Sequence, residues 1–350
     1  MAAYTTIDDP TLHFQVLTYT GDGESTRALT LPGDTDMAPD LVWIKQRNTT
    51  RNHQVNDRVR GTSKVLLADL ADAEDATGGT VKAYGTDGFS VNDSANANED
   101  SGTYVAWCWK ANGTGSANTA GSINTAATSA NTTAGFSINT YTGNSTSGAT
   151  IGHGIGLKPA MIFCKNRDAS QDWLGYHESF GATKHIKLNQ TEALGTASTR
   201  WNDTEPTTTL VTLGNDPQTN GSASMLAYCF ANVQGYSRMG GYTGNGNADG
   251  AFIYTGFRPA FVMNKRTNST ANWVLHDNKR TTFNVCNAYL KPNTNAADTD
   301  DSGRYVDLLS NGFKWRGTDT ETNDSGSTYI YAAFAEAPFV NSNGVPCNAR

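Results

Sequence analysis

The stretch that decides the fold is Pro159-Ala-Met-Ile-Phe-Cys-Lys-Asn-Arg167, a hydrophobic run that begins with proline and ends with two basic side chains. Its consecutive apolar residues suit a strand that is buried on both faces. The proline opens that strand, where a missing N–H does no harm. The same pattern occurs twice more, as Pro39-Asp-Leu-Val-Trp-Ile-Lys-Gln-Arg47 and as Pro259-Ala-Phe-Val-Met-Asn-Lys-Arg266. We interpret the chain as a threefold internal repeat.

A second marker precedes each run and strengthens the repeat. Tyr-Thr-Gly begins at Tyr19, Tyr141 and Tyr242, in each case 17 to 20 residues before the proline. Each repeat also closes with an aromatic run that is typical of a strand. The matching order predicts four segments: a first unit (1–112), a linker (113–130), a second unit (131–235) and a third unit (236–350).

Composition indicates an all-β fold for these units. The 350 residues include 35 glycines, with only 17% charged residues, and Asp-Gly, Asn-Gly, Ser-Gly and Thr-Gly turn signals recur throughout. Short strands between frequent turns favour sandwiches and disfavour helical bundles, which need Leu, Glu and Lys at helical period. We therefore expect three tandem small β-sandwiches of the jelly-roll or lectin-like kind.

The segment between the first and second units is of low complexity. It is built from Gly, Ser, Thr, Asn and Ala, with a single isoleucine, which is typical of a flexible linker. Ordering such a segment costs roughly 1–2 kcal/mol of backbone entropy per residue. We expect it to dock onto a neighbouring copy of the chain, or else onto its own flanking sandwiches.

Charge and hydropathy exclude several classes of protein. A net charge of −7 with no strong basic patch argues against nucleic-acid binding, and no run of 18 apolar residues predicts a membrane span. The N-terminus shows no export signal. Cys108, Cys164 and Cys229 lie in apolar runs and are expected to be buried and reduced, as in a protein made in a reducing cytoplasm.

No motif in the chain predicts catalysis, a metal or a cofactor. Gly152-His-Gly-Ile-Gly156 precedes a strand rather than a helix, so it is a turn and not a phosphate loop. The acidic stretch 298–303 lacks the glutamate that would complete a calcium loop, because Leu309 stands there. No pair of carboxylates recurs among the repeats as a glycosidase would require.

Two sets of residues are candidates for surface or ligand contacts. The basic residues that end the three runs could hold an acidic neighbour or a phosphate, or could pair with nearby acids such as Asp57 and Asp277. Trp201 lies in a polar context and could stack on a sugar, whereas Trp173 and Trp273 are expected in the core. The basic candidates are Lys45, Arg47, Lys165, Arg167, Lys265 and Arg266.

Most of the chain also resembles a known family, and the motifs that carry the resemblance lie in the second and third units. Three stretches are similar to a module of virion structural proteins from marine tailed phages. They are Gly135-Phe-Ser-Ile-Asn-Thr-Tyr-Thr-Gly143, the run from Thr150 to Arg167, and the ending Tyr331-Ala-Ala-Phe-Ala-Glu-Ala-Pro-Phe339. That family is labelled tail-fibre or adhesin and is thought to be similar to concanavalin-type lectin sandwiches. It has no known catalytic residues that could be carried over to this chain.

The resemblance implies a non-enzymatic virion protein. We expect a tail-fibre or adhesin component that homo-oligomerises on the particle, is assembled in the host cytoplasm and leaves by lysis. Its partners would be itself, other virion proteins and a host-surface glycan. A capsid decoration protein is the main alternative, and a carbohydrate-binding module or depolymerase is the third.

Overall fold

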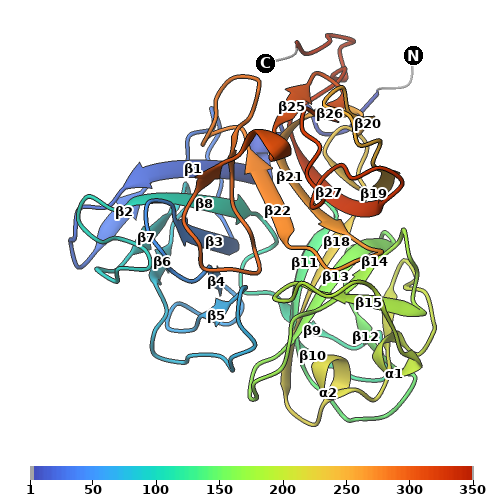
Figure 1. Ribbon diagram of the computed structural model, residues 1–350. Coiled ribbons are helices and arrows are strands. Elements are labelled where there is room, and N and C mark those ends of the chain that lie inside the picture. The colour runs from blue at the N-terminus through green and yellow to red at the C-terminus, as the bar shows by residue number, and fades with distance from the viewer. Residues whose placement is uncertain (1–3, 349–350) are drawn as a thin grey trace.

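The computed structural model describes residues 4–348 and is an all-β protein, as predicted. Residues 1–3 and 349–350 lie outside the described part, and the export-signal prediction falls partly on them. Figure 1 shows three lobes around a common centre, blue to cyan at the left, green below, and orange to red above. Within residues 4–348, no helix is both long enough and apolar enough to cross a membrane.

Each lobe contributes one large antiparallel sheet that faces the centre, which we call its inner sheet. In the first unit the strand order is β1 (Phe14–Thr20), β8 (Thr103–Trp109), β3 (Leu41–Gln46), β4 (Gln54–Asp57) and β5 (Leu66–Leu67). In the third unit it is β19 (Ser237–Thr243), β27 (Thr328–Pro338), β21 (Phe257–Arg266) and β22 (Trp273–Asp277). The second unit has the same central order, β11 (Phe136–Thr142), β18 (Ser224–Ala231), β13 (Pro159–Asn166), β14 (Leu174–His177), β15 (Lys184–Lys187) and β16 (Gly195–Thr196).

A smaller outer sheet covers the far side of each inner sheet. The outer sheets are β2 (Arg27–Leu29), β7 (Phe89–Val91) and β6 (Val81–Tyr84); β12 (Ala149–Gly152) and β17 (Leu210–Leu213); and β20 (Phe252–Tyr254), β26 (Gly312–Trp315) and β25 (Val306–Leu309). The remaining elements are short: β23 (Ala288–Tyr289), β24 (Thr299–Asp300), α1 (Ser198–Trp201), α2 (Pro217–Asn220) and two 3-10 turns (Pro10–Leu12 and Ser302–Arg304).

The strand registers of the three inner sheets match one another. The residue two places after each repeat proline pairs with a large aromatic residue of the closing strand: Leu41 with Trp109, Met161 with Phe230, and Phe261 with Phe334. Pro39, Pro159 and Pro259 therefore hold corresponding places in the three sheets. The division into three tandem sandwich domains stays a prediction.

The central strands are buried on both faces, as the apolar runs predicted. Because side chains alternate along a strand, one set faces the outer sheet, for example Val42, Ile162 and Val262. The other set faces the centre, for example Trp43, Phe163 and Met263. All three inner sheets contribute to this central core. The units thus bury their inner faces against one another.

The predicted linker is instead part of a sheet. Residues 113–130 contain β9 (Ser116–Asn118) and most of β10 (Thr125–Asn131), and β10 pairs with β11 from Asn131 opposite Phe136 to Thr125 opposite Tyr141. The composition offers little apolar surface, but backbone pairing, the buried side chains of Thr125 and Ser129, and Ile123 in the second outer core hold the segment. Figure 1 shows these strands beside β11.

Candidate functional site

The three lysines of the repeat motif are buried, which contradicts the alternative in which they hold a phosphate or an acidic neighbour. Lys45, Lys165 and Lys265 are each 0% exposed. They point toward the centre because they lie two and four residues after inward-facing residues of the same strand. Burial lowers the pKa of each amine to about 8.

All three amines bind backbone carbonyl groups, and two of them do so across a boundary between units. Lys165 Nζ donates to the carbonyl oxygen of Ala71 in the first unit at 3.0 Å. Lys265 Nζ donates to the carbonyl of Thr191 in the second unit at 3.2 Å. Lys45 Nζ instead donates within its own unit, to the carbonyls of Gln46 and Thr49. Two of the three lysines therefore connect units, and all three are inaccessible to a phosphate or an acidic neighbour.

The three arginines of the motif are paired with acids. Arg167 binds Glu74 of the first unit at 2.7 Å, and Arg47 binds Asp298 of the third unit at 2.9 Å. Arg266 pairs with Asp324, at 3.0 Å, within its own unit. The alternative of pairing with nearby acids thus describes these residues, although Asp57 and Asp277 pair with other arginines.

Trp201 is also buried, with 1% of its surface exposed, so it offers no platform for a sugar. Its indole lies edge-on to Tyr176 in the second outer core, because α1 turns it inward. Trp173 and Trp273 are core residues, as predicted. Their indole N–H groups donate across unit boundaries, to the carbonyls of Leu67 and Lys187.

A buried charged cluster lies between the first and second units. Arg60 binds Asp57 at 2.5 Å and Glu74 at 2.9 Å, and Arg167 of the second unit binds the same Glu74. Tyr228 of the second unit donates to Asp57 at 2.6 Å. Burial raises the pKa of the Glu74 carboxyl, but the two arginines outweigh burial and hold this pKa below its ordinary value.

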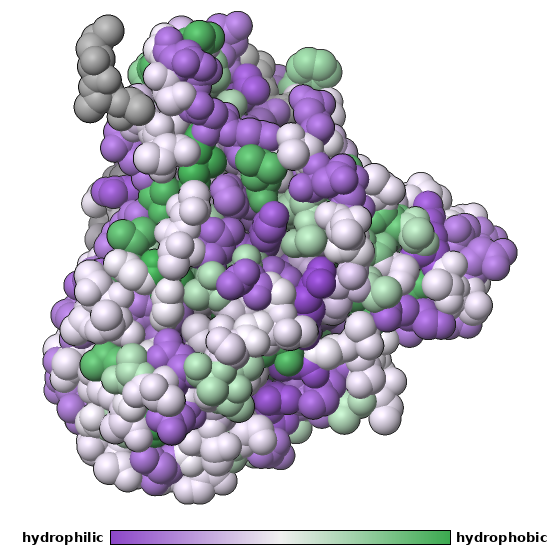
Figure 2. All heavy atoms as spheres, turned by 180° about the vertical axis from the view of Figure 1, so that it is seen from behind, coloured by the Kyte–Doolittle hydropathy of each residue, from purple (hydrophilic) through white to green (hydrophobic). Residues whose placement is uncertain are grey.

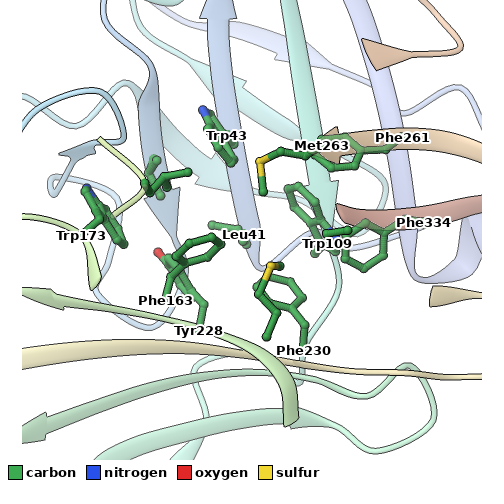
Figure 3. Close-up of a pocket in the computed structure, with 14 residues that line it drawn as sticks. Leu41, Trp43, Trp109, Phe163, Trp173, Tyr228, Phe230, Phe261, Met263 and Phe334 are labelled. Carbon is green, nitrogen blue, oxygen red and sulfur yellow. The ribbon is translucent and has the colours of Figure 1, made fainter. Parts of the chain in front are cut away.

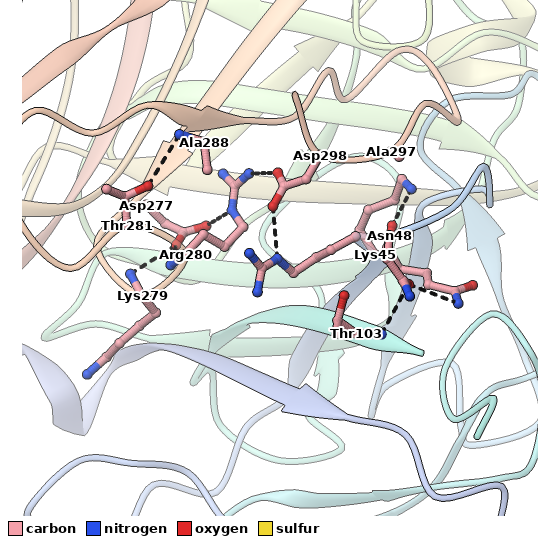
Figure 4. A network of polar contacts seen from close by, with 12 residues as sticks. Lys45, Asn48, Thr103, Asp277, Lys279, Arg280, Thr281, Ala288, Ala297 and Asp298 are labelled. Carbon is pink, nitrogen blue, oxygen red and sulfur yellow. Dashed lines mark hydrogen bonds and ion pairs between the residues drawn. The ribbon is translucent and has the colours of Figure 1, made fainter. Parts of the chain in front are cut away.

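The third and first units meet through a corresponding cluster (Figure 4). Arg280 binds Asp277 at 2.6 Å and Asp298 at 2.5 Å, and Asp298 also binds Arg47 of the first unit. Trp107 of the first unit donates its indole N–H to Asp277 at 3.0 Å. Burial raises the pKa of Asp277, but Arg280 outweighs it, so the pKa is lowered overall.

The second and third units meet through a neutral counterpart. His177 occupies the place of Asp57 and Asp277, because it pairs with Met161 as they pair with the corresponding strand residues. Its Nε2 lies 3.1 Å from the carbonyl oxygen of Tyr331 in the third unit. Burial lowers the pKa of His177 to about 4, which keeps the imidazole neutral.

The three boundaries together close a ring of units within one chain.

A small cavity lies at the centre of this ring (Figure 3). Its volume is about 40 Å³, and its walls are apolar side chains of all three units, including Trp43, Phe163 and Phe334. That space is close to the size of one water molecule, and a water needs polar partners to stay in such a place. The cavity is a packing defect and not a ligand site.

The acidic stretch of the third unit is engaged in pairs. Asp298 binds two arginines, and Asp301 pairs with Arg304. Asp300 accepts hydrogen bonds from Tyr305 and Asn287. Over residues 4–348, His, Cys, Asp and Glu side chains form no group of three or more that could hold a metal ion.

Open grooves occur on the surface of the third unit, at both ends of the edge strand β19. One groove, of about 450 Å³, is lined by Tyr4, Asn232, Val233, Gln234, Ser237, Arg238, Tyr254, Thr255 and Gly256. The other, of about 460 Å³, lies where β19 meets the 179–194 region of the second unit. We call the first of these the Tyr4–Tyr254 groove. Its polar, amide-rich lining makes it the candidate binding site of the chain.

Sequence reasoning missed Tyr4, Arg238 and Tyr254. The repeat motifs directed attention to residues that recur, whereas these three do not. Aligning the units residue by residue would have shown Phe252-Ile-Tyr254 in the third unit where the first has Ala28-Leu-Thr30. This difference between the units is the feature of the sequence that could have identified Tyr254.

Comparison with known families places the chain in one of them. Residues 9–338 match the family described as "Domain of unknown function (DUF7483)", so the protein belongs to that family. The matched range spans all three units, which agrees with their common core. No curated protein matches the chain. No solved structure matches it either.

Proposed function

We propose that this protein is a non-enzymatic structural protein of a tailed-phage particle, and that it serves as a tail-fibre or adhesin component which homo-oligomerises there. The observation that carries the proposal is the closed ring of units. Buried ion pairs and a common apolar core join the three units of one chain. Such buried contacts between units stabilise the fold, which a protein exposed outside the cell requires. The resemblance to phage virion modules agrees with this role.

Two sheet edges support the proposed homo-oligomerisation. β1 and β19 are the terminal strands of their inner sheets, whereas the corresponding strand β11 is covered by β10. On β19, the Met239 N–H already donates to the Asn232 side chain, so the remaining backbone groups are the ones available to another chain. An uncovered strand edge presents N–H and C=O groups that another chain can pair with. The backbone pairing of β10 with β11 shows the kind of contact that a second chain could make with β1 or β19.

The proposal is tested on purified particles. An antibody against the recombinant chain is expected to label the tail or its fibres in electron micrographs of phage whose genome encodes the protein. Mass spectrometry of the same particles should detect the chain at a few to a few tens of copies. Absence from particles that carry their full set of major structural proteins would contradict the proposal.

A capsid decoration protein is the second candidate, and the threefold arrangement of the units favours it. A body with three corresponding lobes fits a site of local threefold symmetry on a capsid lattice. Copy number separates the two candidates, because decoration requires hundreds of copies on the head. Labelling of the head at that number would replace the tail assignment.

A further inference from the structure

The outer strand of the third unit carries two exposed aromatic side chains that the fold does not need. On β20, Phe252 is 46% exposed and Tyr254 is 55% exposed, while Ile253 between them is buried. The two therefore point to the same outer face of the strand. Large exposed apolar side chains that occur together mark interaction sites more often than chance.

The other two units show what the fold itself requires at these places. Ile253 pairs with Phe313, as Leu29 pairs with Phe89 and Ile151 pairs with Val211. By this register, Phe252 and Tyr254 correspond to Ala28 and Thr30 in the first unit, and to Thr150 and Gly152 in the second. Both of those outer sheets form with small residues. The two aromatic rings are therefore additions specific to the third unit.

The surroundings place Phe252 against the strand beside it. A Cβ atom on Gly312 would come within 2.9 Å of Cε2 of the Phe252 ring and within 2.1 Å of the Ile253 carbonyl oxygen. Glycine at this position leaves room for the ring to lie against the sheet. The ring thus offers a broad apolar surface close to the backbone.

Tyr254 forms one wall of the Tyr4–Tyr254 groove. Its hydroxyl lies 3.0 Å from the hydroxyl of Tyr4, which also donates to the carbonyl of Gly256 at 3.0 Å. Gly256 has a φ of +84°, and a Cβ there would lie 2.9 Å from the Tyr4 hydroxyl. These contacts hold the two phenol rings at the groove. In Figure 1, β20 lies at the top, beside the N-terminal segment.

The rest of the groove supplies hydrogen-bonding groups. Gln234 contributes an amide and Arg238 a guanidinium group. The Asn232 amide already binds Glu178 and the Met239 N–H, and the Thr255 hydroxyl donates to the Phe257 carbonyl. Among the described residues, no carboxylate lies within 4.0 Å of the Arg238 guanidinium, unlike most arginines of this chain. Figure 2 shows that one face of the molecule is largely polar, with hydrophobic side chains in small separate patches.

This combination fits the chemistry of a pyranose sugar. One face of a pyranose ring presents C–H groups that stack on an aromatic ring, while its hydroxyl groups need several hydrogen-bonding partners. A cavity of about 450 Å³ lies within the range of small-ligand sites. A specific protein partner would bury about 800 Å² on this chain, most of it beyond the two rings.

We propose that Phe252, Tyr254 and the Tyr4–Tyr254 groove form a saccharide-binding site for cell-surface polysaccharide. The aromatic rings stack on sugar rings, and Gln234 and Arg238 bind their hydroxyl groups. The biological meaning of the site rests on the proposed adhesin function. Its binding test does not depend on where the chain lies in a particle.

The test uses the purified full-length chain and an array of bacterial lipopolysaccharide and capsular polysaccharides. The strongest binder is then titrated by calorimetry against a variant carrying Phe252→Ala and Tyr254→Thr. We expect at least a tenfold loss of affinity with little change in melting temperature, because the first unit folds with those residues. Arg238→Gln should weaken binding severalfold.

Phe283→Ala is the matched control. Phe283 is 75% exposed on a loop of the same unit and does not line the groove, so its loss should leave affinity unchanged. Failure of every polysaccharide to bind, or equal binding by the double variant, would overturn the site while leaving the particle assignment untouched. A double variant that alters only the oligomeric state would show that the rings cover a second copy instead.

Discussion

The Tyr228 hydroxyl donates a 2.6 Å hydrogen bond to Oδ2 of Asp57, a residue 171 positions earlier in the chain. Trp107 stands in the same relation to Asp277, with its indole N–H 3.0 Å from the carboxylate. In both cases an aromatic donor of one unit meets the buried acid of another. The third boundary has Ala332 in place of the aromatic donor, and there His177 reaches the neighbouring backbone carbonyl.

Replacing Tyr228 by phenylalanine should lower the free energy of unfolding by about 1.5–3 kcal/mol, because a buried carboxylate then loses one donor. The matched control is Tyr176→Phe, which removes a 2.6 Å hydrogen bond to the half-exposed carboxylate of Glu205. Water can replace that donor, so a cost below about 1 kcal/mol is expected. Urea denaturation followed by fluorescence measures both. Equal costs would contradict a distinct role for the buried boundary.

Truncating one aromatic residue of the central core should destabilise all three units together. Phe334→Ala and Phe230→Ala each remove a ring from the common core, and a loss of about 3–5 kcal/mol is expected for each. Because the core is common to the three units, calorimetry should show one unfolding transition that moves to lower temperature. A split into two transitions, with one unchanged, would mean that the units are stable on their own.

Acid should weaken the boundary between the second and third units. The pKa of His177 is lowered by burial to about 4, against about 6.5 in an unfolded chain. Between these values the unfolded state binds a proton that the folded state does not, so the free energy of unfolding falls as the pH falls. The stabilisation is complete above pH 6.5, and about 3 kcal/mol is lost by pH 4.

The measurement for His177 is a series of urea denaturations between pH 7 and pH 4. In His177→Gln the amide can still donate to the Tyr331 carbonyl, and the pH dependence should become shallower. His153 and His185 also have pKa values lowered to about 4, so part of the dependence will remain. An unchanged slope would show that His177 does not contribute.

The cysteines should differ sharply in reactivity. Cys108, Cys164 and Cys229 are free and fully buried, and burial raises the pKa of all three thiols, that of Cys164 to about 12. Cys347 is partly exposed. A thiol reagent at pH 8 is expected to modify Cys347 first and the three core thiols only after denaturation. Cys347→Ser should remove the early reaction, and a bridged pair among the three in denatured, non-reduced protein would contradict their free state.

The strands were predictable because their signals are local. The proline, the apolar run and the turn residues around Phe163 specify a strand without reference to the rest of the chain. The burial of Lys165 was not predictable in this way, since a terminal lysine on a strand faces water unless another unit supplies carbonyl groups. Ala71, which supplies one, lies 94 residues away.

The low-complexity segment shows a similar limit. Composition measures how much apolar surface a segment can bury, and residues 113–130 have little. It does not register a strand edge that accepts backbone hydrogen bonds, as β11 does for β10. The candidate site could not be predicted from the repeat pattern, because Phe252 and Tyr254 differ from the residues at the corresponding positions of the other units.

The closed ring has a consequence for synthesis on the ribosome. Trp107 of the first unit can form its hydrogen bond only after Asp277 has been synthesised. Arg47 can form its ion pair only after Asp298 has been synthesised. At about 5–20 residues per second, roughly 10 to 40 seconds separate the making of Trp107 from that of Asp298. During that interval the inner face of the nascent first unit has no partner from the third. We therefore expect the growing chain to expose aromatic surface of the kind that aggregates or binds chaperones until the third unit has been made.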